Sequence, residues 1–185
     1  ERIKVVNLYQ TFIDNASNEE LEKLFGTKKE DIINYYKGNL LEKEIIKVIE
    51  RYDGVAFDYL KYSTLSDIEK AYIDKNVVIF SNLMGPILAG DMGLPDYKLK
   101  QNEKIGNFEL EKFYNEKFSK ALDDYLKDDD VIDLRAGFYE KFYKINKPYT
   151  TMKFIKDGKV VSHWAKAYRG VILNLLAQNN IQTIE

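Results

Sequence analysis

The sequence contains no cysteine and a single histidine, His163. The absence of cysteine excludes disulfide bonds, thiolate catalysis and cysteine-ligated metals, and it fits the reducing cytoplasm, where we expect the protein to reside. A lone His163 cannot build a histidine metal cluster, and beside Trp164 it is more often a packed residue than a base. The acidic stretch 123–130 lacks the spacing of a calcium loop. We therefore expect no metal and no cofactor.

Long apolar runs are also missing. No segment approaches the ~20 residues of a membrane-spanning helix, and no cationic and apolar leader is present. A net charge of −2 argues against a generally basic nucleic-acid binder. Of the 185 residues, 45% are hydrophobic and 14% aromatic, which is enough to build a core. We expect one compact domain over residues 1–185, most simply a monomer.

The charge is unevenly distributed along the chain. Residues 131–185 contain nine lysines and arginines against four acids, a net charge of +5, so the rest of the chain carries −7. This asymmetry favours a local anion-binding face on a mildly acidic protein. The alternative is that these cations form only a solvated surface.

The first part of the chain, about residues 1–75, has the pattern of short capped helices. Apolar residues recur at helical spacing over residues 4–14, and Ser17 or Asn18 can cap the helix that follows. Further caps are predicted at Thr27 with Glu30 for a helix ending at Gly38, at Asn39 for a helix through Tyr52, and at Ser66 with Glu69.

Strands enter in the second part, about residues 76–185. Residues 76–81 and 130–135 are short β-branched runs beside turn residues, and each follows a predicted helix. A long amphipathic helix is predicted over about 107–127, and Asp157-Gly158 is a favoured turn pair for a hairpin. We expect an α+β fold in which helices wrap a mixed sheet.

Residues 21–36 have the pattern of two short helices around a glycine-containing turn, which is close to a helix-hairpin-helix element. In that motif, backbone N–H groups at the turn and at the start of the second helix hold a DNA phosphate without reading bases. The contacts would come from Gly26, Thr27, Lys28 and Lys29. Lys28 replaces the usual second glycine, and an ordinary turn between two helices is the alternative.

The stretch HWAKAYRG opens the last predicted helix and places Lys166 and Arg169 in its first turn. The partial positive charge at a helix N-terminus makes cations there unfavourable, by roughly 0.3–1 kcal/mol each. Three environments could offset this cost: a carboxylate such as that of Asp91, open solvent, or a bound anion such as a phosphate.

The loop after the predicted strand 76–81 gathers polar side chains. Loops beyond the carboxyl ends of strands are favoured ligand positions in α/β sheets. This loop offers a hydroxyl, a carboxylate, a phenol and an ammonium group, from Ser81, Asp91, Tyr97 and Lys98. No GxSxG, Walker A, GxGxxG or HExxH motif identifies a reaction.

Four segments, in the same order, resemble the YaaA family of bacterial peroxide-stress proteins. SHWAKAYRG is similar to the family's S-F-Y-A-K-K-A-R-G at Ser162, Ala165, Lys166, Arg169 and Gly170. Residues 80–99 resemble L-S-G-L-Y-G-x-L-R-P-x-D-x-x-x-P-Y-R-L at Ser81, Leu83, Gly85, Asp91, Pro95, Tyr97 and Leu99, with Lys98 as the basic residue. RYDGVAFDYL resembles K-G-D-V-Y-x-G-L, and VIDLRAGFYEKF resembles V-I-N-L-A-S-x-E-Y-F-K, with Tyr139 and Lys141 as equivalents.

The resemblance covers about residues 50–180. It implies a cytoplasmic α+β protein of the hydrogen peroxide response that limits oxidative DNA damage and binds duplex DNA non-specifically through a helix-hairpin-helix element and a basic cleft. It also implies that the sequence lacks the family's N-terminal S-P-A/S-K-like strand end and C-terminal E-G-Y-x-F segment. The DNA- or anion-binding residues would be Gly26, Thr27, Lys28, Lys29, Ser81, Tyr97, Lys98, Lys141, Lys166 and Arg169.

An enzyme is the competing interpretation. A cleft containing Ser81, Tyr97, Lys98, Lys166 and Arg169 could act on a nucleotide or a damaged nucleobase, with Lys166 as the nucleophile. The sequence offers no clear catalytic carboxylate with a partnered base to support it. A third interpretation, a pure interaction module, predicts an exposed apolar patch and no anion site.

Overall fold

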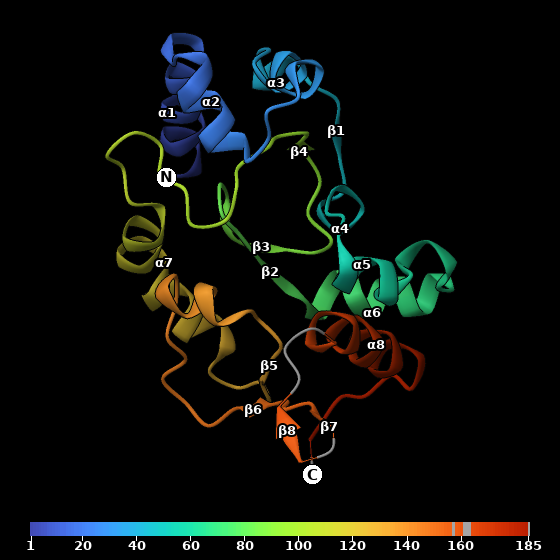
Figure 1. Ribbon diagram of the computed structural model, residues 1–185. Helices are drawn as coiled ribbons and strands as arrows, with labels where there is room; N and C mark the ends of the chain where they lie inside the picture. The colour runs from blue at the N-terminus through green and yellow to red at the C-terminus, as the bar shows by residue number, and fades with distance from the viewer. Residues whose placement is uncertain (157, 161–163, 185) are drawn as a thin grey trace.

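The computed structural model describes residues 1–156, 158–160 and 164–184 (Figure 1). Asp157, Ser162 and His163, singled out above, lie outside the described residues. The α-helices are α1 (Arg2–Asn15), α2 (Asn18–Phe25), α3 (Glu30–Tyr36), α4 (Val48–Arg51), α5 (Val55–Leu60), α6 (Asp67–Asn76), α7 (Leu110–Leu126) and α8 (Ala165–Gln178). Short 3-10 helices are η1 (Leu40–Glu42), η2 (Tyr62–Thr64) and η3 (Gly137–Lys141). The strands are β1 (Ile45–Ile46), β2 (Val78–Ser81), β3 (Gly85–Leu88), β4 (Leu94–Pro95), β5 (Ile132–Asp133), β6 (Thr150–Thr151), β7 (Ile155–Lys156) and β8 (Lys159–Val160).

Local capping patterns begin several of these helices. Ser17 forms the predicted capping box with Glu20 at the start of α2, and Ser66 forms one with Glu69 at the start of α6. The capping box predicted for Thr27 is wrong, because its hydroxyl accepts a hydrogen bond from the Lys29 N–H at 3.2 Å. Lys29 is therefore the N-cap of α3, and its side chain makes no capping bond.

The helix predicted to run from Asn39 through Tyr52 is also wrong. Asn39 does cap, since its side chain accepts from the Leu41 N–H, but it begins only the short η1. The β-branched pair Ile45–Ile46 then forms β1, which pairs antiparallel with β4. β-Branched residues favour extended backbone, and here a distant partner strand is present to satisfy the backbone groups. The helix resumes only at α4.

The α+β class is confirmed, but the predicted mixed sheet is not found among the described residues. Their strands pair only in twos: β1–β4, β2–β3 and β7–β8 are antiparallel, and β5–β6 is parallel. Strand β3 lies in a stretch whose Gly-Pro content indicated a loop. A side chain at Gly85 would put its Cβ 2.3 Å from the Tyr114 ring, and its φ is +68°, so glycine lets the β2–β3 hairpin lie against α7.

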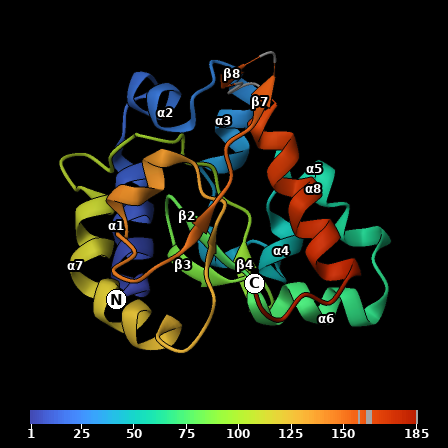
Figure 2. The ribbon, with the colours of Figure 1, turned by 90° about the horizontal axis from the view of Figure 1, so that it is seen from below.

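Two apolar clusters surround the β2–β3 hairpin, which lies at the centre of the molecule (Figure 1). The larger cluster joins α1, α2 and α7 to this hairpin, with Tyr9, Phe25, Leu83 and Tyr114 among its buried members. The smaller cluster joins α5, α6 and α8, which pack beside one another in both views (Figure 2). Gly170 of α8 permits this packing, since a Cβ there would lie 2.0 Å from the carbonyl oxygen of Ala56 in α5.

Candidate functional site

The turn between α2 and α3 contains four of the predicted site residues. Gly26 ends α2 in the left-handed conformation, with φ of +65°, and its N–H reaches back to the carbonyl oxygens of Glu22 and Lys23. A Cβ on Gly26 would lie 2.7–3.3 Å from side-chain carbons of Lys100, so glycine also lets residues 26 and 100 approach closely. Lys28 and Lys29 are exposed, and neither forms an ion pair with a described carboxylate.

The start of α3 carries acids as well as these lysines. Glu30 and Asp31 lie in its first turn, where carboxylates interact favourably with the N–H groups and the helix dipole. They would repel a phosphate placed on the same N–H groups. The two helices and their turn are therefore present as predicted, but the structure does not identify them as a helix-hairpin-helix element.

Ser81 and Tyr97 belong to a chain of hydroxyl groups at the end of β2. The Ser81 Oγ lies 2.5 Å from the Tyr97 hydroxyl, which lies 2.9 Å from the Tyr52 hydroxyl. Ser81 is only 2% exposed, and its Oγ also accepts the Met84 N–H at 2.9 Å. Burial raises the pKa values of Tyr52 and Tyr97 above the ordinary range, so both phenols stay protonated. The structure brings the predicted pair together and adds Tyr52, which we did not predict.

Lys98, next to Tyr97, faces α3. Its Nζ lies 5.6 Å from the centre of the Tyr36 ring, and its carbonyl oxygen accepts the Tyr9 hydroxyl at 2.8 Å. Together with Asp31, Ile32, Tyr35 and Tyr36 it lines a shallow pocket of about 350 Å³. Lys98 therefore lies between two features: it follows Tyr97 of the hydroxyl chain in sequence, and its side chain lies beside α3.

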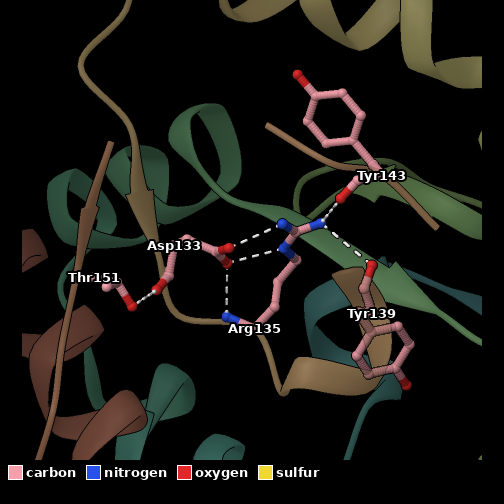
Figure 3. Close-up of polar contacts among 5 residues, drawn as sticks. All are labelled: Asp133, Arg135, Tyr139, Tyr143 and Thr151. Carbon is pink, nitrogen blue, oxygen red and sulfur yellow. Dashed lines mark hydrogen bonds and ion pairs between the residues drawn. The ribbon is translucent and has the colours of Figure 1, made fainter. Parts of the chain in front are cut away.

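Arg135 and Asp133 form a half-buried ion pair that we did not predict as a unit (Figure 3). Both side chains are 11% exposed, and two hydrogen bonds of 2.8 Å join the guanidinium to the two carboxylate oxygens. The guanidinium also donates to the carbonyl oxygens of Tyr139 and Tyr143, and it lies 4.6 Å from the centre of the Phe80 ring. The available signal was a carboxylate and a guanidinium two residues apart at a strand end.

Lys166 lies in the first turn of α8 as predicted, but Arg169 is the fifth residue of the helix and begins its second turn, so its predicted place in the first turn is wrong. Lys166 is exposed and Arg169 half-buried. The proposed ion pair with Asp91 is not present, and neither cation pairs with any other described carboxylate. Arg169 is close enough to Asp133 to help lower the pKa of that carboxyl.

Lys141, the remaining predicted cation, ends η3. Its side chain is exposed, and its Nζ lies 5.5 Å from the centre of the Phe138 ring. The ring of Tyr139, two residues earlier, has its centre 6.5 Å from the centre of the Phe80 ring. Burial raises the pKa of the Tyr139 phenol to about 12. Tyr139, another position of the family resemblance, is thus part of the packing around Arg135.

The lysine-bearing segments lie at opposite ends of one side of the molecule. In Figure 1, α2 and α3 occupy one end, and α8 with β5–β8 occupies the other, with the β2–β3 hairpin between them. In the perpendicular view of Figure 2, α2, α3, β7, β8 and the first turn of α8 lie toward the same edge. The α2–α3 turn and the start of α8 therefore lie toward the same edge in Figure 2, with the centre of the fold between them in Figure 1.

The described residues contain no group of three acidic or histidine side chains placed to hold a metal ion. In the same part of the chain, no helix has the length and apolarity to cross a membrane. Acids of the stretch 123–130 have protein partners instead: Asp123 accepts from the Tyr143 hydroxyl, and Asp124 pairs with Lys120.

Comparison with known proteins places these features in a family. A family model described as peroxide stress protein YaaA matches residues 3–185. An uncharacterized protein of Campylobacter jejuni is 49% identical over 98% of this chain and 73% of the relative. UPF0246 proteins of Fusobacterium nucleatum and Corynebacterium glutamicum are 28% and 36% identical, over 97% and 70% of this chain and 75% and 54% of the relatives. The chain therefore belongs to the YaaA family of peroxide stress proteins.

Proposed function

We propose that the protein binds duplex DNA non-specifically, as a cytoplasmic monomer, and that this binding limits oxidative damage to DNA. Membership of the YaaA family supports a role in peroxide stress. The cations Lys28, Lys29, Lys166 and Arg169 carry the proposal. The elements that bear them, the α2–α3 turn and the start of α8, lie toward the same edge in Figure 2, and none of the four side chains has an ion pair with a described carboxylate.

Cations of this kind suit non-specific binding. Contacts between lysine or arginine and DNA phosphates release counterions and supply most of the sequence-independent affinity. Such contacts position a protein on the duplex without reading bases. A net charge of −2 on the whole chain disfavours DNA at the other faces, so a local cationic side also gives the protein one binding orientation.

Within the α2–α3 turn, we assign the phosphate contacts to the Lys28 and Lys29 side chains. The N–H groups at the start of α3 are less suited, since Glu30 and Asp31 stand in the same turn. Thr27 and Gly26 then serve the turn itself: the Thr27 hydroxyl holds the Lys29 N–H, and Gly26 supplies the left-handed residue.

The enzymatic alternative has less support from the geometry. The Ser81 Oγ is buried and already bonded to Met84 and Tyr97, as in a structural turn, so it is poorly placed to attack a substrate. Lys166 is exposed, and no described side chain hydrogen-bonds to it as a base would. A nucleophilic lysine usually needs desolvation or a close partner.

Fluorescence anisotropy with a labelled duplex tests the proposal. We expect affinity to be independent of base sequence and to fall linearly with the logarithm of salt concentration, with a slope set by the number of phosphates contacted. Absence of binding at low salt would overturn the proposal.

A further inference from the structure

The proposed phosphate contacts leave unused the shallow pocket lined by Asp31, Ile32, Tyr35, Tyr36 and Lys98. We propose that this pocket binds one unpaired nucleobase of the DNA. The inference rests on the proposed function, and it assigns the protein a preference for DNA in which a base has left the stack.

Tyr35 provides a fixed aromatic surface at the pocket. It is 56% exposed, yet its hydroxyl donates to Asp96 Oδ2 at 2.9 Å, and the neighbouring Tyr36 hydroxyl donates to Oδ1 of the same carboxylate at 3.3 Å. The two rings are perpendicular, with centres 4.9 Å apart. The hydrogen bond to Asp96 raises the pKa of Tyr35, so the phenol remains a donor at neutral pH.

Lys43 holds the same ring from another side. Its Nζ lies 3.6 Å from the centre of the Tyr35 ring and donates to the Tyr35 carbonyl oxygen at 2.8 Å. The ring is thus held at its hydroxyl, on one face and at its backbone, while more than half of the residue stays open to solvent. Because the Tyr35 side chain is already held in place, a ligand that stacks on it loses little free energy in ordering that side chain, which favours binding.

The side chains that line the pocket can each contact a different part of a nucleotide. A base can stack on Tyr35 or Tyr36 and contact the aliphatic Ile32, as bases stack on aromatic side chains in proteins that bind single strands. Asp31, one helical turn before Tyr35, can accept from the amino group of a base. Lys98, on the other side of the pocket, can contact the attached phosphate.

Other ligand classes fit less well. An isolated phosphate would meet the carboxylate of Asp31, and a cation would meet the ammonium group of Lys98. A planar uncharged group with one phosphate avoids both repulsions. A volume of about 350 Å³ is at the small end for ligand pockets, which suits one base better than a dinucleotide cofactor.

The pocket also lies within reach of the proposed phosphate contacts. Lys29 and Tyr35 are six residues apart across α3, or about 9 Å along the helix at 1.5 Å per residue. That is the span of roughly three base-pair steps at 3.4 Å each. A duplex held by the α2–α3 lysines is therefore close enough along the helix axis for an extruded base to reach Tyr35, which lies about a third of a turn around α3 from Lys29.

Anisotropy with two bulged duplexes tests the inference. One carries a single extra adenosine, and the other carries an abasic nucleotide at the same place, so both have the same number of backbone phosphates. We expect wild-type protein to bind the adenine bulge about fivefold more tightly, which corresponds to the low end, about 1 kcal/mol, of the stacking energies measured per base. Tyr35→Ala should abolish this difference and leave affinity for a fully paired duplex unchanged.

Two variants serve as controls. Tyr35→Phe keeps the ring and should keep the preference. Tyr125→Ala removes a similarly exposed tyrosine, 50% exposed on α7, and should also keep it. Loss of the preference in Tyr125→Ala would overturn the assignment to this pocket.

The remaining outcomes separate the two proposals. Equal wild-type affinity for the two bulged duplexes overturns the nucleobase pocket and leaves non-specific DNA binding intact. No binding to any duplex overturns both. Binding of adenosine monophosphate alone, as tightly as the adenine bulge and dependent on Tyr35, overturns DNA as the source of the base and assigns the pocket to free nucleotides.

Discussion

Asp133 and Arg135 show how single residues stabilise the region around η3. Burial alone would raise the pKa of Asp133, but the hydrogen bonds from the Arg135 side chain and backbone N–H, helped by the positive charges of Arg135 and Arg169, lower it overall. The guanidinium in turn joins β5 to the carbonyl oxygens of Tyr139 and Tyr143. Removing either partner would leave a half-buried charge unpaired.

Asp133→Asn should destabilise the protein by about 1.5–3 kcal/mol at neutral pH, the range for hydrogen bonds to charged groups, as measured by urea unfolding. Because the folded-state pKa of Asp133 is lowered, its contribution is complete above the unfolded-state value, about 3.9, and is lost as pH falls through the folded-state value. The stability difference between wild type and variant should therefore stay constant from about pH 5 to 8 and narrow below about pH 4. Asp58→Asn, an exposed control on α5, should show almost no difference at any pH.

Unlike Asp133→Asn, Arg169→Ala should not destabilise the protein. Arg169 has no ion pair with a described carboxylate, and it stands at a helix N-terminus three residues from Lys166. Removing it relieves unfavourable interactions with the dipole and with Lys166 but also removes its attraction to Asp133, so the melting temperature should change little. Affinity for DNA or phosphate should fall. Thermal melts with and without phosphate check this, and a loss of about 3–5 kcal/mol in both would indicate a buried ion pair instead.

At the scale of elements, the sequence predicts what depends on near neighbours. Ser17 and Ser66 cap their helices as expected, because a capping box involves residues three apart. Ile45–Ile46 and the residues of β3 were assigned wrongly, because β1 depends on β4, about fifty residues away, and β3 depends on a glycine that fits against Tyr114. The pairing of Ser81 with Tyr97 was anticipated only as membership of one loop.

The residues of the candidate site also fall into two groups: those that local sequence predicts and those that only tertiary contacts bring together. The cations of the α2–α3 turn and of α8 were predictable because they belong to helix ends, which local sequence specifies. The pocket at Tyr35 was not, because Asp96 and Lys98 reach α3 from some sixty residues further along the chain. Contacts of this kind follow from tertiary packing, which a single sequence does not encode at any fixed spacing.

Gly170→Ala tests how tightly α8 packs on α5. The added Cβ would lie 2.0 Å from the Ala56 carbonyl oxygen and 2.8 Å from the Leu60 nitrogen, both backbone atoms that cannot rotate away. We expect a loss of about 3 kcal/mol in chemical unfolding, at the upper end for overpacking. Gly137→Ala, where the nearest atom is a Glu140 carboxylate oxygen at 3.7 Å, should be tolerated. Equal effects of both variants would contradict the packing argument.

For the whole molecule, the salt dependence of DNA binding should show whether the cations of the α2–α3 turn and those of α8 contact the same duplex. Lys28→Ala/Lys29→Ala should reduce the salt slope of DNA binding by about one unit per lost phosphate contact, and Lys166→Ala/Arg169→Ala should do the same. If one duplex spans the side, the four-residue variant should show the sum of both reductions. Lys120→Ala/Lys127→Ala on the α7 side, where both lysines pair with aspartates, should leave the slope unchanged. A slope that responds to only one pair would confine DNA to that end.

The packing of α5 on α8 also constrains how the chain is made. More than a hundred residues separate Leu60 from Ala165, so a ribosome that adds about 5–20 residues per second takes roughly 5–20 s to pass from one helix to the other. During that interval the surface of α5 that receives Gly170 has no partner, and the smaller apolar cluster is incomplete. Among the described residues, the larger cluster, by contrast, has no member beyond Phe142. The larger cluster can therefore form before the smaller one is complete, and the face of α5 that receives Gly170 stays exposed until α8 has been made.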